Sequence, residues 1–108
     1  MNQFDEFIEG IKTGAKDLAR EIFDGFEDQA RNDTNAFLEK AQADLQRWTR
    51  LLAQGDLTEQ DFSDLIQAKK ALAEIHALRQ AGVALTKLER FRTRFINLVI
   101  DTAFNVFL

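Results

Sequence analysis

The chain has no cysteine and no proline among its 108 residues, and it has a single histidine. The lack of cysteine excludes a disulfide framework, a thiolate nucleophile, and zinc or iron–sulfur sites built on cysteine. The lack of proline removes the strongest helix breaker and favours helices throughout. At this length the chain should form one domain, with a core that needs neither disulfides nor metal.

Motifs that carry common chemistry are also missing. The sequence has no glycine-rich phosphate loop, no nucleophile elbow and no calcium-binding loop. The histidine, His76, has no Glu three residues before it, as carboxylate-bridged metal sites in bundles require. Glu74 lies two positions away and faces another side of a helix. We therefore expect a non-enzymatic protein without catalytic residues, cofactor or metal.

The charge balance is acidic and uneven. The formal net charge is −4, because 18 acidic residues outnumber 14 basic ones, and the acidic excess lies in the first half of the chain. A net-acidic protein is repelled by phosphate backbones, so we expect no nucleic-acid partner. The first ten residues are acidic and lack the basic segment of a secretory signal, which predicts a cytoplasmic protein.

The first half of the chain has the apolar spacing of amphipathic helices. One seam alternates steps of four and three, as in a coiled coil: Phe4, Ile8, Ile11, Ala15, Leu18 and Ile22. A second seam runs through Thr34, Leu38, Ala41, Leu45, Trp48 and Leu52. Between them, QARNDTN (29–35) is rich in residues that favour caps and turns. We place a joint near Asn32–Thr34; one continuous helix from Phe4 to Gln54 is the alternative.

Several signals predict a tight reversal in AQGDLTEQDF (53–62). Gly55 stands where a helix would end, because glycine adopts the left-handed conformation at low cost. Thr58 is then an N-cap, with Asp61 in the third helical position completing a variant capping box. Leu57 and Phe62 have the spacing of a hydrophobic staple around that cap.

The fold class that follows is all-α: an antiparallel helical hairpin that turns at Gly55–Leu57. Helices are expected over residues 3–31, 34–54, 59–81 and 83–107. Gly82 either ends the third helix or lies within a longer one. A continuous helix through the joints near 32–34 and 82 is the alternative.

A reversal at 55–57 brings residue i close to residue 112 − i. The acidic stripe Asp17, Glu21, Asp24 and Asp28 then faces the basic residues Lys87, Arg90, Arg92 and Arg94. Phe23 falls near Phe91, and Phe7 near Phe104 and Phe107, each buried ring contributing roughly 1.5–3 kcal/mol of transfer free energy. Two architectures satisfy this register: a four-helix bundle within one chain, or a dimer of long hairpins.

The last fourteen residues, FINLVIDTAFNVFL, are the most apolar part of the chain. Three arginines just before them leave a run too short to span a bilayer. We predict a helical protein–protein interaction or assembly module, self-associating as a dimer or higher oligomer or binding a further protein partner. Its candidate interaction surface is formed by Phe4, Phe7, Ile8, Phe91, Phe95, Val99, Phe104 and Phe107. The alternative is a peripheral membrane or lipid-binding protein that uses the apolar helix 95–108.

Overall fold

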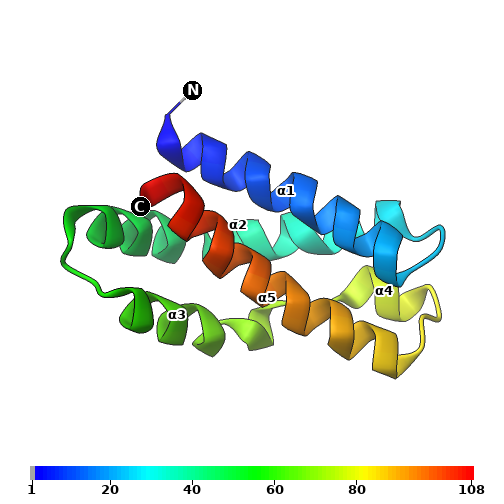
Figure 1. Cartoon of the computed structure of the whole chain (residues 1–108). Coiled ribbons are helices and arrows are strands. Elements are labelled where there is room, and N and C mark those ends of the chain that lie inside the picture. Colours follow the sequence, from blue (N-terminus) through cyan, green and yellow to red (C-terminus); the bar gives the residue numbers. More distant parts are fainter. Residues whose placement is uncertain (1) are drawn as a thin grey trace.

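The structure, a computed structural model, describes residues 2–108, which form helices and short connections without a strand (Figure 1). The elements are α1 (Gln3–Ile22), α2 (Glu27–Gln54), α3 (Glu59–Ala68), the 3₁₀ turn η1 (Lys70–Leu72), α4 (His76–Gln80) and α5 (Leu85–Phe107). Four of these helices, α1, α2, α3 and α5, pack against one another, and α4 lies against α2 and α5. The all-α prediction is confirmed, and one chain completes the bundle.

The reversal after α2 is confirmed in detail. Gly55 has φ 82°, and its N–H donates to the carbonyls of Leu51 and Leu52 in the last turn of α2. The hydroxyl of Thr58 accepts a hydrogen bond from the N–H of Asp61 at 3.0 Å. Phe62 is fully buried and Leu57 packs on the same core. Local sequence signals were sufficient here because every one of them acts within a few residues.

The first joint lies at residues 23–26, so the prediction of a break at Asn32–Thr34 is wrong, and so is the continuous helix from Phe4 to Gln54. Gly25, with φ 92°, turns the chain between α1 and α2. The turn lets Phe23 and Phe26 meet edge to face, with ring centroids 6.4 Å apart. Residues 32–35 stay helical because tertiary contacts of this part of α2 outweigh the local preference of its residues for turns. Thr34 is buried and Asp33 binds another helix.

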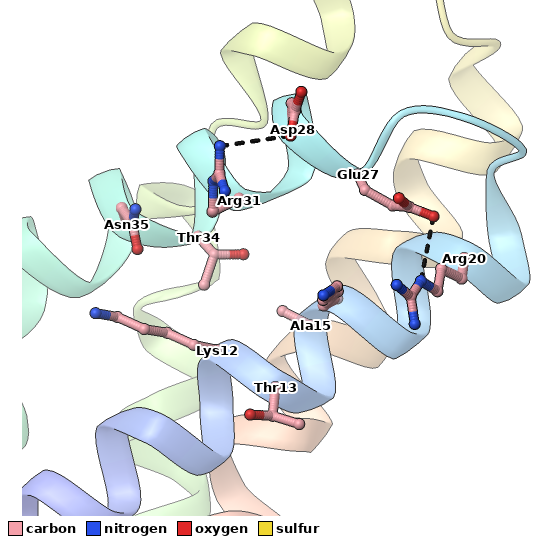
Figure 2. Close-up of a pocket in the computed structure, with 10 residues that line it drawn as sticks. Lys12, Thr13, Ala15, Arg20, Glu27, Asp28, Arg31, Thr34 and Asn35 are labelled. Atoms are coloured by element: carbon pink, nitrogen blue, oxygen red, sulfur yellow. Dashed lines mark hydrogen bonds and ion pairs between the residues drawn. The ribbon is translucent and has the colours of Figure 1, made fainter.

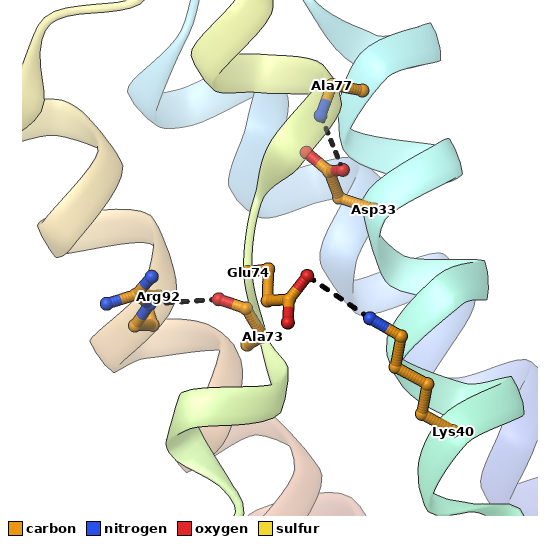
Figure 3. A network of polar contacts seen from close by, with 6 residues as sticks. All are labelled: Asp33, Lys40, Ala73, Glu74, Ala77 and Arg92. Atoms are coloured by element: carbon orange, nitrogen blue, oxygen red, sulfur yellow. Dashed lines mark hydrogen bonds and ion pairs between the residues drawn. The ribbon is translucent and has the colours of Figure 1, made fainter.

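The helix predicted over 59–81 is broken into α3, η1 and α4. The carbonyl of Ala73, in the connection, accepts a hydrogen bond from Nε of Arg92 at 2.9 Å (Figure 3). Asp33 on α2 accepts the N–H groups of Ala77 and Leu78 at 2.8 and 2.9 Å. A carboxylate from another helix therefore caps α4. Gly82 (φ 85°) then separates α4 from α5, so continuous helix there is also wrong.

Just before that cap the backbone takes an unusual conformation. Ile75, directly preceding α4, has φ 48° and is the one described residue other than glycine in the left-handed region. A β-branched side chain is strained there, and the buried position of Ile75 offsets that strain. Lys40 on α2 also pairs with Glu74 at 3.2 Å, so this connection is held from α2 and from α5.

The first and last helices are antiparallel neighbours, as the register of 112 − i predicts (Figure 1). The ring of Phe7 lies 5.7 Å from that of Phe107, and the ring of Phe23 lies 5.4 Å from that of Phe91. Phe104 packs instead on Phe62 of α3, at 6.0 Å. The pairing of α1 with α5 thus forms one wall of the core.

Of the predicted cross-bundle charge contacts, one forms: Arg94 pairs with Glu21. Asp28 pairs with Arg31 on its own helix. Arg92 binds the carbonyl of Ala73 and the carboxylate of Glu89. Short-range partners therefore compete successfully with the long-range ones that the stripe suggested.

Candidate functional site

The structure divides the predicted interaction surface into two sets. Phe7, Phe91, Phe95 and Val99 lie in the interior of the single chain, with exposed fractions of 0–2%. Phe4, Ile8, Phe104 and Phe107 are half-buried at the periphery of the same core. A partner of the folded chain therefore reaches only the second set.

Little other apolar surface remains exposed. Among residues 2–108 the exposed large hydrophobic side chains are Leu85 (71% exposed) and Leu108 (62%), at opposite ends of α5. Within the same residues, no helix combines the length and hydropathy needed to cross a membrane. The apolar residues of α5 mostly face the core rather than solvent.

An extended concave feature follows the seam between α1 and α2. Three adjoining cavities of about 560, 330 and 430 Å³ lie along it. The first two share Phe4, Asp5 and Gln46, and the second and third share Lys12 and Asn35. We call this continuous feature the α1–α2 groove. It remains unfilled because α1 packs most closely on α5, while polar side chains of α2 line much of the seam.

One end of the groove carries the half-buried side chains of Phe4, Ile8 and Phe107, and we call it the Phe4 end. Phe4 and Phe107 line its outermost cavity together with polar residues, and Ile8 lines the adjoining cavity. Asp5 and Arg50 stand beside these side chains, and neither forms an ion pair with any residue from 2 to 108. This end therefore offers apolar contacts together with one free charge of each sign.

The other end is basic, and we call its cavity of about 430 Å³ the basic pocket (Figure 2). Its charged lining residues are Lys12, Lys16, Arg20 and Arg31, with the acids Glu27 and Asp28. Glu27 pairs with Arg20 at 3.2 Å and Asp28 pairs with Arg31 at 3.4 Å. Neither lysine forms an ion pair within the described chain. Two positive charges are thus left without a carboxylate partner.

Thr34 completes the basic pocket with a buried hydroxyl. Its residue is 2% exposed, and within residues 2–108 its Oγ1 is the buried side-chain polar atom without a hydrogen-bond partner. Thr49, equally buried on the same helix, donates to the carbonyl of Leu45 at 2.7 Å. Figure 2 shows the hydroxyl of Thr34 turned into the space between α1 and α2.

The basic row on α1 is visible in the sequence. Lys12, Lys16 and Arg20 recur every four residues, which places them on one helical face. The row alone predicts no site, because the same helix also carries Asp17 and Glu21 of the acidic stripe. The pocket itself carries no sequence signal, since it depends on which face of α1 turns towards α5.

A separate cluster of charges surrounds the one tryptophan. Asp44 pairs with Lys69 at 2.6 Å and with Arg47 at 3.1 Å. The hydrogen bond from Lys69 is the main cause that lowers the pKa of Asp44. Lys69 and Arg47 lie 5.4 and 6.0 Å from the ring centroid of Trp48. This cluster covers the edge of the core and lines none of the groove.

His76 lies exposed at the beginning of α4. In the part of the chain that the structure describes, no three His, Cys, Asp or Glu side chains gather as metal ligands. No family model, curated protein or solved structure matches the chain.

Proposed function

We propose that the protein is a non-enzymatic helical interaction module that self-associates through the Phe4 end of the α1–α2 groove. The observation that supports it is the lining of that end, where Phe4, Ile8 and Phe107 are only half-covered by the chain itself. These residues belong to the accessible part of the surface that the sequence suggested, whose fourth member, Phe104, does not line the groove.

The charges beside these residues favour a second copy of the chain as the partner. A twofold interface brings the same patch of both subunits together, so a patch with one acid and one base can complement itself. Asp5 and Arg50 are such a pair. Apolar contacts would supply most of the affinity, and the two charges would set the orientation. Three half-buried apolar side chains per subunit form only a small contact, so we expect a weak, reversible dimer rather than an obligate one.

A charge exchange tests this interface. Asp5→Arg and Arg50→Asp should each weaken the dimer in sedimentation equilibrium, and the double variant should restore it. Ile8→Asp should give a monomer, whereas Leu85→Asp, at an exposed apolar site outside the groove, should leave the mass unchanged. A strictly monomeric wild-type protein at millimolar concentration contradicts the proposal.

Lipid binding by residues 95–108 has less support. Phe95 and Val99 would have to leave the core to reach a membrane, and the cost of exposing each is roughly 1.5–3 kcal/mol. We therefore do not propose it.

A further inference from the structure

We infer that the basic pocket binds a small phosphate-bearing anion, held by Lys12, Lys16 and the hydroxyl of Thr34. This site lies at the end of the groove opposite to the proposed dimer contact. It does not rest on self-association, and its test is separate.

The shape of the pocket suits a small molecule. Its volume of about 430 Å³ falls within the range of natural ligand sites. One wall comes from α1 and the other from the first turns of α2, as Figure 2 shows. Both walls are regular helices, so the backbone positions of the lining residues are fixed without a ligand, while the exposed lysine side chains are free to turn towards one.

The charges on this pocket call for a counterion. Lys12, Lys16 and Arg20 stand one turn apart on one helix, and like charges at this spacing repel one another. The ion pairs to Glu27 and Asp28 occupy the two arginines and leave the lysines free. A phosphate group carries close to two negative charges at neutral pH, which matches two free ammonium groups.

Thr34 supplies an observation independent of charge. A buried hydroxyl without a partner destabilises the fold, and helical threonines ordinarily avoid this by donating to the preceding turn, as Thr49 does. Thr34 also borders a separate void of only about 10 Å³ with mostly apolar walls. That void is at the lower limit for one water molecule. The Oγ1 of Thr34 is almost wholly covered in this structure, so a ligand oxygen in the basic pocket would satisfy the hydroxyl after a small movement of the side chains around it.

These groups indicate the class of ligand. Figure 2 shows the side chain of Lys12 extended towards Asn35, so it would turn to meet a ligand beside Thr34. Two ammonium groups and one hydroxyl would then offer several donors, which suits a compact anion with many acceptor oxygens. A long polyanion such as nucleic acid would meet the net charge of −4 of the whole chain and is disfavoured.

The test is an amide NMR titration of the full chain with inorganic phosphate and with pyrophosphate, at an ionic strength held constant with sodium chloride. We expect saturable shifts that centre on residues 12–16 and 31–35. Lys12→Gln with Lys16→Gln should abolish saturation. Thr34→Val should weaken binding by about 10-fold, the loss expected for one charge-assisted hydrogen bond.

Matched variants separate the site from general charge and from unfolding. Thr49→Val and Lys87→Gln should leave affinity within about twofold of wild type, since they alter the same residue types outside the pocket. Thr34→Val should also melt at a higher temperature than wild type in phosphate-free buffer, because it removes an unsatisfied hydroxyl. Absence of saturable shifts with either anion, or an equal loss of affinity in Lys87→Gln, overturns the inference.

Discussion

Arg94 donates two hydrogen bonds to the carboxylate of Glu21, from Nη1 to Oε1 at 2.9 Å and from Nη2 to Oε2 at 3.0 Å. This bidentate pair joins α1 to α5 across 73 positions of sequence. It fixes the register of the two helices at the place where the acidic stripe meets the basic one.

The pair should give stability a defined pH dependence. The hydrogen bond from Arg94 lowers the pKa of Glu21 below its ordinary value of 4.5. A carboxyl with a lowered folded pKa stabilises fully above its unfolded pKa and loses this effect as pH falls through the folded one. Arg94→Gln should therefore melt below wild type near pH 7, and the gap should close as the pH falls below about 4.5 and through the lowered folded pKa of Glu21. Arg90→Gln is the control; a pH-independent gap contradicts the assignment.

The close approach of α1 and α5 predicts that Gly14→Ala is destabilising. A Cβ at position 14 would lie 2.5 Å from Cδ1 of Leu98, so Leu98 must move. Alanine gains about 1 kcal/mol in helix propensity, whereas overpacking costs about 1–3 kcal/mol. We expect a lower urea midpoint for Gly14→Ala than for wild type. When Leu98→Ala has already removed the obstructing side chain, adding Gly14→Ala should lower the midpoint by less. An increase in stability for Gly14→Ala would contradict this and show that the side chain of Leu98 moves aside at little cost.

Removing the cap that α2 provides to α4 should loosen α4 first. Asp33→Ala should cost about 1–2 kcal/mol, as loss of a good N-cap does. The amides of Ala77 and Leu78 should then exchange faster with solvent, since both lose their acceptor. Asp33→Asn keeps one acceptor oxygen and should be intermediate. Asp24→Ala removes an exposed acid elsewhere; equal effects of Asp24→Ala and Asp33→Ala would contradict the cap.

The short helix α3 should depend on one aromatic anchor. Its 10 residues are too few for a helix that is stable alone. Phe62 is fully buried against Phe104, so Phe62→Ala should cost about 3–5 kcal/mol in chemical denaturation. Leu65→Ala, at a half-buried position on the same helix, should cost clearly less. Similar losses at both positions would mean that contacts along the whole of α3 stabilise it, rather than the ring of Phe62 in particular.

The sequence predicted those parts of the fold that depend on local chemistry or on simple register. The reversal at Gly55 needed only cap residues, and its position then set the pairing of Phe23 with Phe91. The break before Gly25 was missed because the helical period almost continues through it. The breaks on either side of η1 were missed because no glycine or proline marks them, and contacts from Asp33 and Arg92 hold the chain there.

The candidate site was less predictable than the fold. Seams of apolar residues show which faces turn inward, but they do not distinguish a residue buried within its own chain from one kept for a partner. Phe7 and Phe4 belong to one seam face, yet only Phe4 reaches the groove. That distinction depends on the rotation of α1 about its axis, which the close contact of Gly14 with α5 helps to set.

The apolar stripe of α1 packs most extensively on α5. It therefore stays partly exposed until the end of the chain has been synthesised. Contacts between such distant positions raise the contact order above that of bundles whose neighbours are sequential, and folding slows accordingly. During translation the stripe of Ile11, Ala15 and Ala19 is exposed to the crowded cell while more than half of the protein is still being made. The yield of refolding experiments should therefore be limited by aggregation of the unfolded chain rather than by the free energy of unfolding.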